Sequence, residues 1–243
     1  MLNTENTFQF KQFTIHQDKC GMKVNTDGVL LGVWSDVVSK VKILDIGTGT
    51  GVIALILAQK KPEAMITGID IDENACLQAY ENFRESPFKD RLECTCSSIQ
   101  DFAIQSEQTF DLIISNPPFF SGGTFSLNEN KANVRHTIKL PHSDLLRSVK
   151  RLLKPDGHFD LILPYIEGLK FIEMARSYDL YLQTQTNVIS KPKNGIERLL
   201  LRFGNIPREK QENTLLIQEE HHKVNEYTDA YTQMVQPFYP FLP

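Results

Sequence analysis

The sequence predicts an α/β fold in which a mainly parallel sheet of seven strands carries helices on both faces. Short apolar runs of strand length alternate along the chain with longer segments whose apolar residues have helical spacing. This alternation is typical of parallel strands joined by crossover helices. The chain of 243 residues is also 41% hydrophobic, which is enough apolar material for one large core.

The predicted elements follow one another without a long linker, so we expect a single domain, residues 1–243, with residues 41–243 as its core. A helix capped by Thr26 or Asp27 and running through Trp34 precedes the core, and a short helix ended by Pro237 follows it. The predicted core strands are 41–47, 65–71, 91–97, 110–116, 157–164, 181–190 and 196–203. The predicted core helices are 52–60, 73–83, 144–153 and 171–178.

Composition argues against a membrane protein, a secreted protein and a metalloprotein. No apolar run has the 18 residues that a membrane-spanning helix needs, and the start MLNTENTFQF lacks the build of a secretory signal. We therefore expect a cytoplasmic protein that binds no membrane. Its four cysteines, Cys20, Cys76, Cys94 and Cys96, do not form two pairs at metal-ligand spacing. Reduced thiols and no metal site are expected.

The net charge is −4, but basic residues are concentrated in two segments. Residues 131–160 hold seven Lys and Arg against three Asp and Glu, and residues 189–210 hold six against two. Residues 61–110 instead hold four against ten. A polyanion can therefore bind locally despite the negative total, although solvated helix faces explain the same pattern.

A glycine-rich turn predicts a nucleotide-type cofactor at the end of the first core strand. Gly47, Gly49 and Gly51 lie between a strand and a helix, where glycine permits a tight turn and lets a ligand approach the backbone closely. Asp70 ends the next strand, where a carboxylate can accept hydrogen bonds from both hydroxyls of a ribose. These residues fit an adenosyl cofactor.

Two details favour S-adenosylmethionine over NAD as that cofactor. The glycines have the spacing G-T-G-T-G, so the G-x-G-x-x-G fingerprint for a pyrophosphate is absent. Asp45 lies two residues before the first glycine, where its carboxylate can face the amino group of an amino-acid ligand. NAD has no such group. The alternative for Asp45 is a turn or cap residue.

The turn Asn116–Phe119, with the sequence NPPF, is the predicted catalytic element. It follows strand 110–116 at the edge of the sheet where ligands bind in open α/β folds. Pro117 and Pro118 fix the backbone and have no N–H, which leaves the Asn116 side-chain oxygen and the Pro117 carbonyl as acceptors. Two acceptors on the hydrogens of a conjugated amine free its lone pair for methylation, while Phe119 stacks on the base. A rigid structural turn is the alternative.

These motifs together resemble the class I S-adenosylmethionine-dependent methyltransferases, which have a Rossmann-like fold. Among them the chain is similar to the bacterial enzymes that methylate N6 of adenine 37 in valine tRNA. The resemblance runs from about residue 8 to the C-terminus. It is carried by MKVNTDGVLLGVW (22–34), LDIGTGTGVIAL (44–55), GIDID (68–72), DLIISNPPFF (111–120) and AYTQMVQPFYPF (230–241). It implies N6-methylation of an adenine in the anticodon loop of tRNA(Val), with tRNA as the partner.

The resemblance also implies roles for residues outside the glycine turn. The family's TDG stretch lies over the cofactor, so Thr26, Asp27 and Gly28 are expected there, with residues 1–40 as an extension over the cofactor site. Where family members commonly place an Asp for the cofactor adenine, this chain has Ser98. The expected cofactor-binding residues are Thr26, Asp27, Gly28, Asp45, Gly47, Thr48, Gly49, Gly51, Asp70, Ile71, Ser98 and Ile99. The expected RNA contacts are Arg135, Lys191, Lys193 and Arg198, each with a solvated charge as the alternative.

Three other functions compete with this interpretation. Methylation of a glutamine amide in a release factor uses the same turn, because an amide nitrogen is equally delocalised. Methylation of a guanine amine in rRNA is the second, and usually brings more chain for a second domain. The third, of another class, is a non-catalytic module that binds S-adenosylmethionine or a nucleotide. The intact NPPF turn argues against it, because binding alone does not need that turn.

Overall fold

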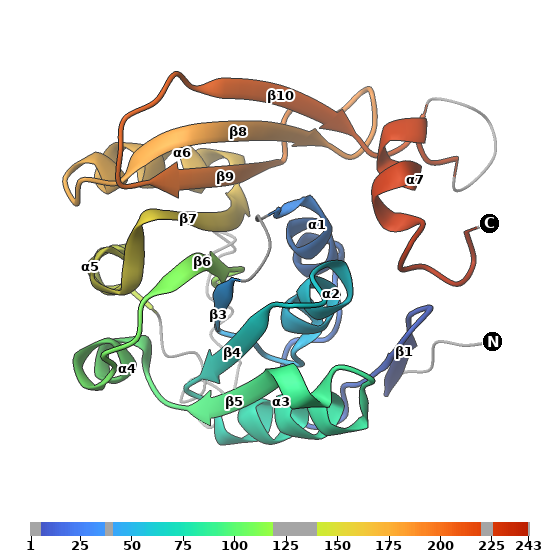
Figure 1. Cartoon of the computed structure of the whole chain (residues 1–243). Helices are drawn as coiled ribbons and strands as arrows, with labels where there is room; N and C mark the ends of the chain where they lie inside the picture. Colours follow the sequence, from blue (N-terminus) through green and yellow to red (C-terminus); the bar gives the residue numbers. More distant parts are fainter. Residues whose placement is uncertain (1–5, 37–40, 119–139, 220–225, 243) are drawn as a thin grey trace, which may run out of the picture.

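The computed structural model describes residues 6–36, 41–118, 140–219 and 226–242 (Figure 1). Its centre is one sheet with the strand order β10-β8-β9-β7-β6-β3-β4-β5. The parallel part is formed by β3 (Lys42–Ile46), β4 (Met65–Asp70), β5 (Leu92–Cys96), β6 (Phe110–Ser115) and β7 (Leu153–Pro164). The far end is formed by β8 (Tyr181–Ile189), β9 (Arg198–Gly204) and β10 (Gln211–Leu216). Strand β9 runs antiparallel to both of its neighbours.

The predicted α/β class is confirmed, but the sheet has eight strands and not seven. The eighth, β10, pairs in parallel with β8 at the edge. Its sequence QENTLL begins with four exposed residues, and only Leu215 is buried. An edge strand with so little apolar surface has no alternating pattern to reveal it.

Helices cover both faces of the sheet, as predicted (Figure 1). On one side lie α1 (Thr26–Trp34), α2 (Val52–Lys60) and α3 (Glu73–Glu85), and on the other α4 (Ile99–Gln105), α5 (His142–Leu152) and α6 (Tyr165–Arg176). Alternate strand residues supply the two cores: on β6, Leu112 and Ile114 pack with the first set, and Ile113 with the second. No helix in the described ranges is long and apolar enough to cross a membrane.

The N-terminal segment and the C-terminal segment pack together outside the sheet. A small antiparallel pair, β1 (Thr7–Gln9) and β2 (Thr14–His16), lies near the last helix, α7 (Asp229–Val235) (Figure 1). The Lys11 N–H donates to the Phe238 carbonyl at 2.7 Å, and the rings of Phe10 and Tyr239 stack with centroids 6.0 Å apart. The aromatic end of the chain therefore covers the first strands.

The strand register brings the three predicted motifs to one edge of the sheet. Ile46, the last residue of β3, pairs with Ile69 of β4 on one side and with Ser115 of β6 on the other. Because these strands are parallel, the turns that follow them lie side by side. The Ser115 hydroxyl also donates to the Ile46 carbonyl at 2.9 Å, which ties the ends of the two strands together.

Candidate active site

A cavity of about 720 Å³ lies at the carboxyl ends of β3, β4, β5 and β6. This volume is within the range of roughly 300–1,000 Å³ that small-molecule sites occupy. Four segments contribute residues to its wall: 20–28, 46–53, 69–75 and 97–101. Asn116, Pro118 and Leu140 complete the described part of the wall.

The glycine turn forms one wall of this cavity in a conformation that favours glycine. Gly47, Gly49 and Gly51 have φ angles of 70°, 56° and 80°, all in the left-handed region. A Cβ on Gly51 would lie 2.4 Å from Cε1 of the buried Phe83. Side chains are therefore excluded at Gly51 by backbone strain and by lack of space. Gly47 and Gly49 line the cavity, and Gly51 supports the turn from behind.

Asp70 lies at the end of β4 and lines the cavity. Its Oδ2 accepts the Gly49 N–H at 3.0 Å, and its Oδ1 accepts the Asp72 N–H at 3.0 Å. These bonds fix the carboxylate toward the glycine turn and leave it further lone pairs. A fixed acceptor of this kind suits a pair of ribose hydroxyls, and the contact with a ribose stays a prediction.

Asp45 is fully buried beneath the glycine turn and is not part of the cavity wall. Thr48 Oγ1 donates to its Oδ2 at 2.7 Å, while its Oδ1 has no hydrogen-bond partner within the described ranges. Burial raises the pKa of Asp45 to about 7; the Thr48 hydrogen bond lowers it and the charge of Asp70 raises it. A cationic ligand group near Asp45 would supply the missing hydrogen-bond donor and offset the free-energy cost of the buried carboxylate. A contact with the amino group of the ligand stays a prediction.

The raised pKa of Asp45 predicts that the free energy of unfolding of the ligand-free protein depends on pH. The folded carboxyl has a pKa of about 7 against an ordinary value of 3.8, so it ionises later in the folded state than in the unfolded state. The free energy of unfolding therefore falls as pH rises between these two values, and this term is constant outside them. Asp45→Asn removes the ionisable group. The stability of the variant relative to the wild type should rise over that interval, as measured by urea unfolding at about pH 5 and about pH 8. An unchanged stability difference would contradict the burial argument.

The predicted catalytic turn begins inside the cavity. Asn116 lines it, and the side-chain Oδ1 of Asn116 is buried without a hydrogen-bond partner within the described ranges. Pro117 is buried against the protein, and the exposed Pro118 lies on the cavity wall. A buried acceptor without a donor costs free energy unless a ligand supplies one. Phe119, the predicted stacking residue, lies outside the described residues.

The N-terminal extension contributes to the cavity wall, but not with all of the residues expected there. Asn25, and neither Thr26 nor Asp27, caps α1: its Oδ1 accepts the Gly28 N–H at 2.9 Å. Asn25 and Gly28 line the cavity, whereas Thr26 and Asp27 do not. The Asp27 carboxylate instead accepts a hydrogen bond from Nε of Arg198 at 2.8 Å. The sequence motif therefore marks a segment that lines the cavity, although Asp27 itself binds Arg198 of β9.

Next to Asp70, the cavity wall is formed by apolar and polar side chains that follow β4 and β5. Ile71 is 48% exposed on the wall, and the buried Ile99 also lines it, so both can contact a flat aromatic ring. The Ser98 hydroxyl accepts the Asp101 N–H at 3.0 Å and donates to Asp101 Oδ2 at 2.6 Å. Ser98 therefore serves as the cap of α4 and orients Asp101, which also lines the cavity.

Comparisons with known proteins agree with this geometry. A family model described as a methyltransferase domain matches residues 38–225. A relative in Bacteroides fragilis, named tRNA1(Val) (adenine(37)-N6)-methyltransferase, is 41% identical over 236 residues. The match covers 96% of this chain and 97% of the relative. The chain belongs to the tRNA1(Val) (adenine(37)-N6)-methyltransferase family. A relative of the same name in Vibrio campbellii is 40% identical, with 96% of this chain and 95% of the relative covered.

Solved structures support the fold of this tRNA methyltransferase family. A predicted O-methyltransferase from Agrobacterium tumefaciens aligns with a TM-score of 0.68 at 16% identity, over 87% of this chain and 96% of its own. A TehB-like SAM-dependent methyltransferase from Corynebacterium glutamicum aligns with a TM-score of 0.53 at 22% identity, over 74% and 88%. The Rossmann-like class I fold is therefore confirmed.

The methyl donor of the tRNA1(Val) methyltransferase family is S-adenosylmethionine, and the cavity fits it. The donor combines an adenine, a ribose and an amino acid with a cationic sulfur. The wall offers apolar side chains, a fixed carboxylate at Asp70, a glycine turn and Asn116, whose buried Oδ1 has no hydrogen-bond partner within the described ranges. Among the described residues no cluster of side chains is suited to hold a metal ion.

The predicted RNA-binding residues divide into two groups. Lys191 and Lys193 are exposed in the turn between β8 and β9. This turn leaves the sheet at the same edge as Asn116, because Arg198 at the start of β9 pairs with Pro164 at the end of β7. Arg198 is bound to Asp27, so its guanidinium is already partly used. Arg135 lies outside the described residues.

Sequence reasoning missed several residues of the cavity in this methyltransferase. Cys20, Met22, Lys23 and Asn25 line it, but of the motif at residues 22–34 only the TDG stretch was assigned a role. The helix-cap preference of asparagine was the one local signal that pointed to Asn25. The others lack a local signal, because only tertiary packing brings this segment over the glycine turn.

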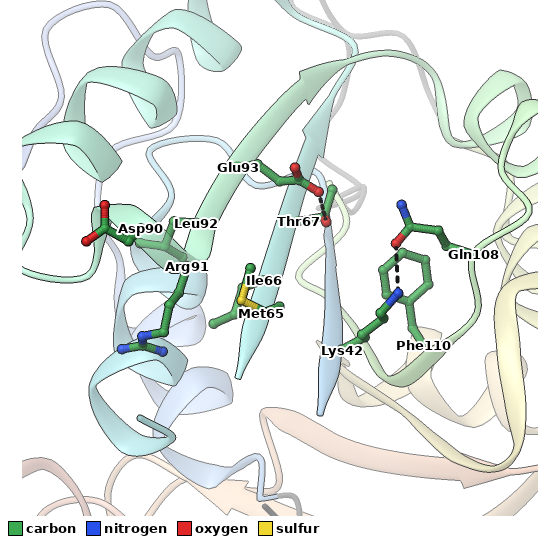
Figure 2. A pocket seen from close by; sticks show the side chains of 10 residues that line it. All are labelled: Lys42, Met65, Ile66, Thr67, Asp90, Arg91, Leu92, Glu93, Gln108 and Phe110. Atoms are coloured by element: carbon green, nitrogen blue, oxygen red, sulfur yellow. Dashed lines mark hydrogen bonds between the residues drawn. The ribbon is translucent and has the colours of Figure 1, made fainter. Parts of the chain in front are cut away.

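A second, smaller cavity of about 220 Å³ lies where β3, β4, β5 and β6 begin, at the opposite end of the sheet (Figure 2). Four of its polar side chains bond one another in pairs: Thr67 donates to Glu93 at 2.7 Å, and Lys42 donates to Gln108 at 3.5 Å. None of the predicted site residues lines it. We therefore assign the chemistry of the methyltransferase to the larger cavity.

Proposed function

We propose that this protein transfers a methyl group from S-adenosylmethionine to N6 of adenine 37 in the anticodon loop of tRNA(Val). The observation that carries the proposal is the buried Asn116 Oδ1, which lacks a donor within the described ranges and lies in the cavity wall beside Pro118. An exocyclic amine supplies the missing donor. The names of the full-length relatives in Bacteroides fragilis and Vibrio campbellii support the choice of tRNA.

In this proposal, residues of the chain position the two reactants and supply no formal base. S-adenosylmethionine, when bound, supplies a methyl group activated by a sulfonium. Asp70 orients the ribose, and Ile71 and Ile99 contact the adenine of the donor. Asn116 Oδ1 and the Pro117 carbonyl accept the N6 hydrogens, which holds the amine lone pair toward the methyl group. Catalysis then rests on alignment and on fixed dipoles.

The target adenine has to leave the stack of the anticodon loop to reach this cavity. Enzymes that act on a base commonly swing it out of its stack into a pocket. Phe119 is proposed to stack on the extruded base, which typically contributes about 1–3 kcal/mol. We also propose that residues 1–243 act as one domain, with residues 1–40 as an extension over the donor. Residues 20–28 support this, because members of that segment line the cavity.

Nucleoside mass spectrometry tests the proposed substrate directly. The purified protein is incubated with the methyl donor and an unmodified valine tRNA, and the methylated nucleoside is identified and mapped. N6-methyladenosine at position 37 is expected, and none in a matched tRNA with guanine at that position. A release-factor protein in the same tube serves as competitor. Methylation of a glutamine in the release factor would contradict the proposal and favour the glutamine methyltransferase. Methylation of a guanine in place of adenine 37 would favour the guanine methyltransferase.

Charge reversal in the β8–β9 turn tests the proposed RNA contact. Lys191→Glu with Lys193→Glu should weaken tRNA binding for all sequences, because phosphate contacts do not read bases. The slope of log K against log salt should become shallower by about 0.7 for each phosphate that the variant no longer binds. Filter binding at several salt concentrations measures both effects.

The matched control reverses Lys11 and Lys89, which are exposed and lie outside this turn. The two double variants have the same net charge, so a difference between them reports position. Equal weakening by both would show a general charge effect and remove the turn from the proposed RNA surface.

A further inference from the structure

The orientation of the donor follows from three fixed points of the cavity. All four residues Asp70, Ile71, Ser98 and Ile99 line the cavity. In the proposed function, Asp70 binds the ribose of the donor, and the other three lie at the end that receives its adenine. The methyl group has to face Asn116 for transfer. The amino-acid part of the donor therefore extends from the sulfur toward the remaining wall, formed by the glycine turn and residues 20–28.

Residues 20–28 run along the glycine turn toward the catalytic asparagine. At one end, the Cys20 sulfur lies 3.7 Å from the position of a Cβ on Gly49. At the other end, a Cβ on Gly28 would lie 3.6 Å from Val52 Cγ1 and 3.7 Å from Asn116 Nδ2. Lys23 lies between Cys20 and Gly28 in the sequence and lines the cavity.

Lys23 is the only basic side chain among the described residues that line the cavity. The other charged residues of this wall are the acidic Asp70, Asp72 and Asp101. A carboxylate that enters this cavity is repelled by these acidic groups, and a nearby cation offsets the repulsion. At the start of α1, the Gly28 N–H is already bound by Asn25.

We propose that Lys23 binds the α-carboxylate of the amino-acid part of the donor and thereby selects ligands that carry it. This inference rests on the methyl donor and is independent of the RNA substrate. The acidic wall attracts the amino group and the sulfonium, and the Lys23 ammonium supplies a complementary charge for the carboxylate. Release of a demethylated product that keeps the carboxylate should depend on the same contact.

The test compares two ligands that differ only in the carboxylate. S-adenosylhomocysteine and its decarboxylated form are titrated into the wild type and Lys23→Met by calorimetry. The variant should bind the carboxylated ligand about tenfold more weakly, which corresponds to about 1.4 kcal/mol. Its affinity for the decarboxylated ligand should stay the same as in the wild type. Lys23→Arg should recover part of the affinity, because it restores the positive charge.

Lys19→Met is the matched control, because Lys19 lies just before residues 20–28 and forms an ion pair with Glu81. It should leave both affinities unchanged. Equally weaker binding of both ligands by Lys23→Met would reveal a merely structural role, and unchanged binding of both would exclude the contact. Both results overturn the proposal. Retained binding of the decarboxylated ligand shows that the variant is folded, and a failure here leaves the tRNA assignment intact.

Discussion

Replacing Asn116 by alanine should lower the rate of methyl transfer by about a hundredfold or more, while the affinity for S-adenosylmethionine changes little. The magnitude follows from other enzymes, in which removal of one fixed hydrogen-bonding group at the reacting centre typically costs about 10²–10³ in kcat. Here the removed group is a buried oxygen that has no partner within the described ranges, so its full capacity is available to the target amine.

Single-turnover assays with saturating donor and RNA separate this effect from binding. Asn116→Asp is the informative second variant, because it keeps the acceptor oxygen and nearly the same shape but adds a negative charge. We expect it to retain more activity than Asn116→Ala. If the alanine variant transfers methyl groups at a rate close to the wild type, the asparagine does not bind the amine and the NPPF turn is structural.

Replacing Asp70 by alanine should lower the affinity for the donor by at least tenfold. Hydrogen bonds to a charged group contribute roughly 1.5–3 kcal/mol each, and the carboxylate is placed to accept one or two from the ribose. The same substitution removes the acceptors of the Gly49 and Asp72 N–H groups. Part of the effect will therefore come from a looser glycine turn.

A ligand without one ribose hydroxyl separates these two causes. Calorimetry with S-adenosylhomocysteine and its 2′-deoxy form should show that the wild type discriminates between them. Asp70→Ala should bind both with similar low affinity. If the variant keeps the discrimination of the wild type, Asp70 only supports the turn, and another group binds the ribose.

Much of the fold followed from local sequence patterns, because its central strands are continuous apolar runs. VKILDIG and FDLIISN are buried on both faces of the sheet, and such runs have few other conformations that bury them. Strand β10 and helix α4 were not predicted from the sequence. Of the seven residues of α4, only Ile99 and Ala103 are buried, so its sequence has little of the pattern of a core helix.

The candidate site followed from sequence where its residues come directly after strands. Gly47, Asp70 and Asn116 each follow or end a strand, and parallel strands bring such positions to one edge. The wall formed by residues 20–28 was located only through a family resemblance. Asp27 shows the limit of that approach, because nothing local distinguishes a cavity contact from an ion pair with Arg198, 171 residues away.

That long separation has a consequence for how the protein is made. Domains generally fold as units during synthesis, starting from the N-terminus, and contacts between distant residues form late. Residues 20–28, which line the cavity, are among the first to be translated, but Arg198, which binds Asp27, is translated long after them. A nascent chain that stops before β9 lacks this attachment. The cavity wall formed by residues 20–28 therefore gains its attachment to β9 only late in synthesis.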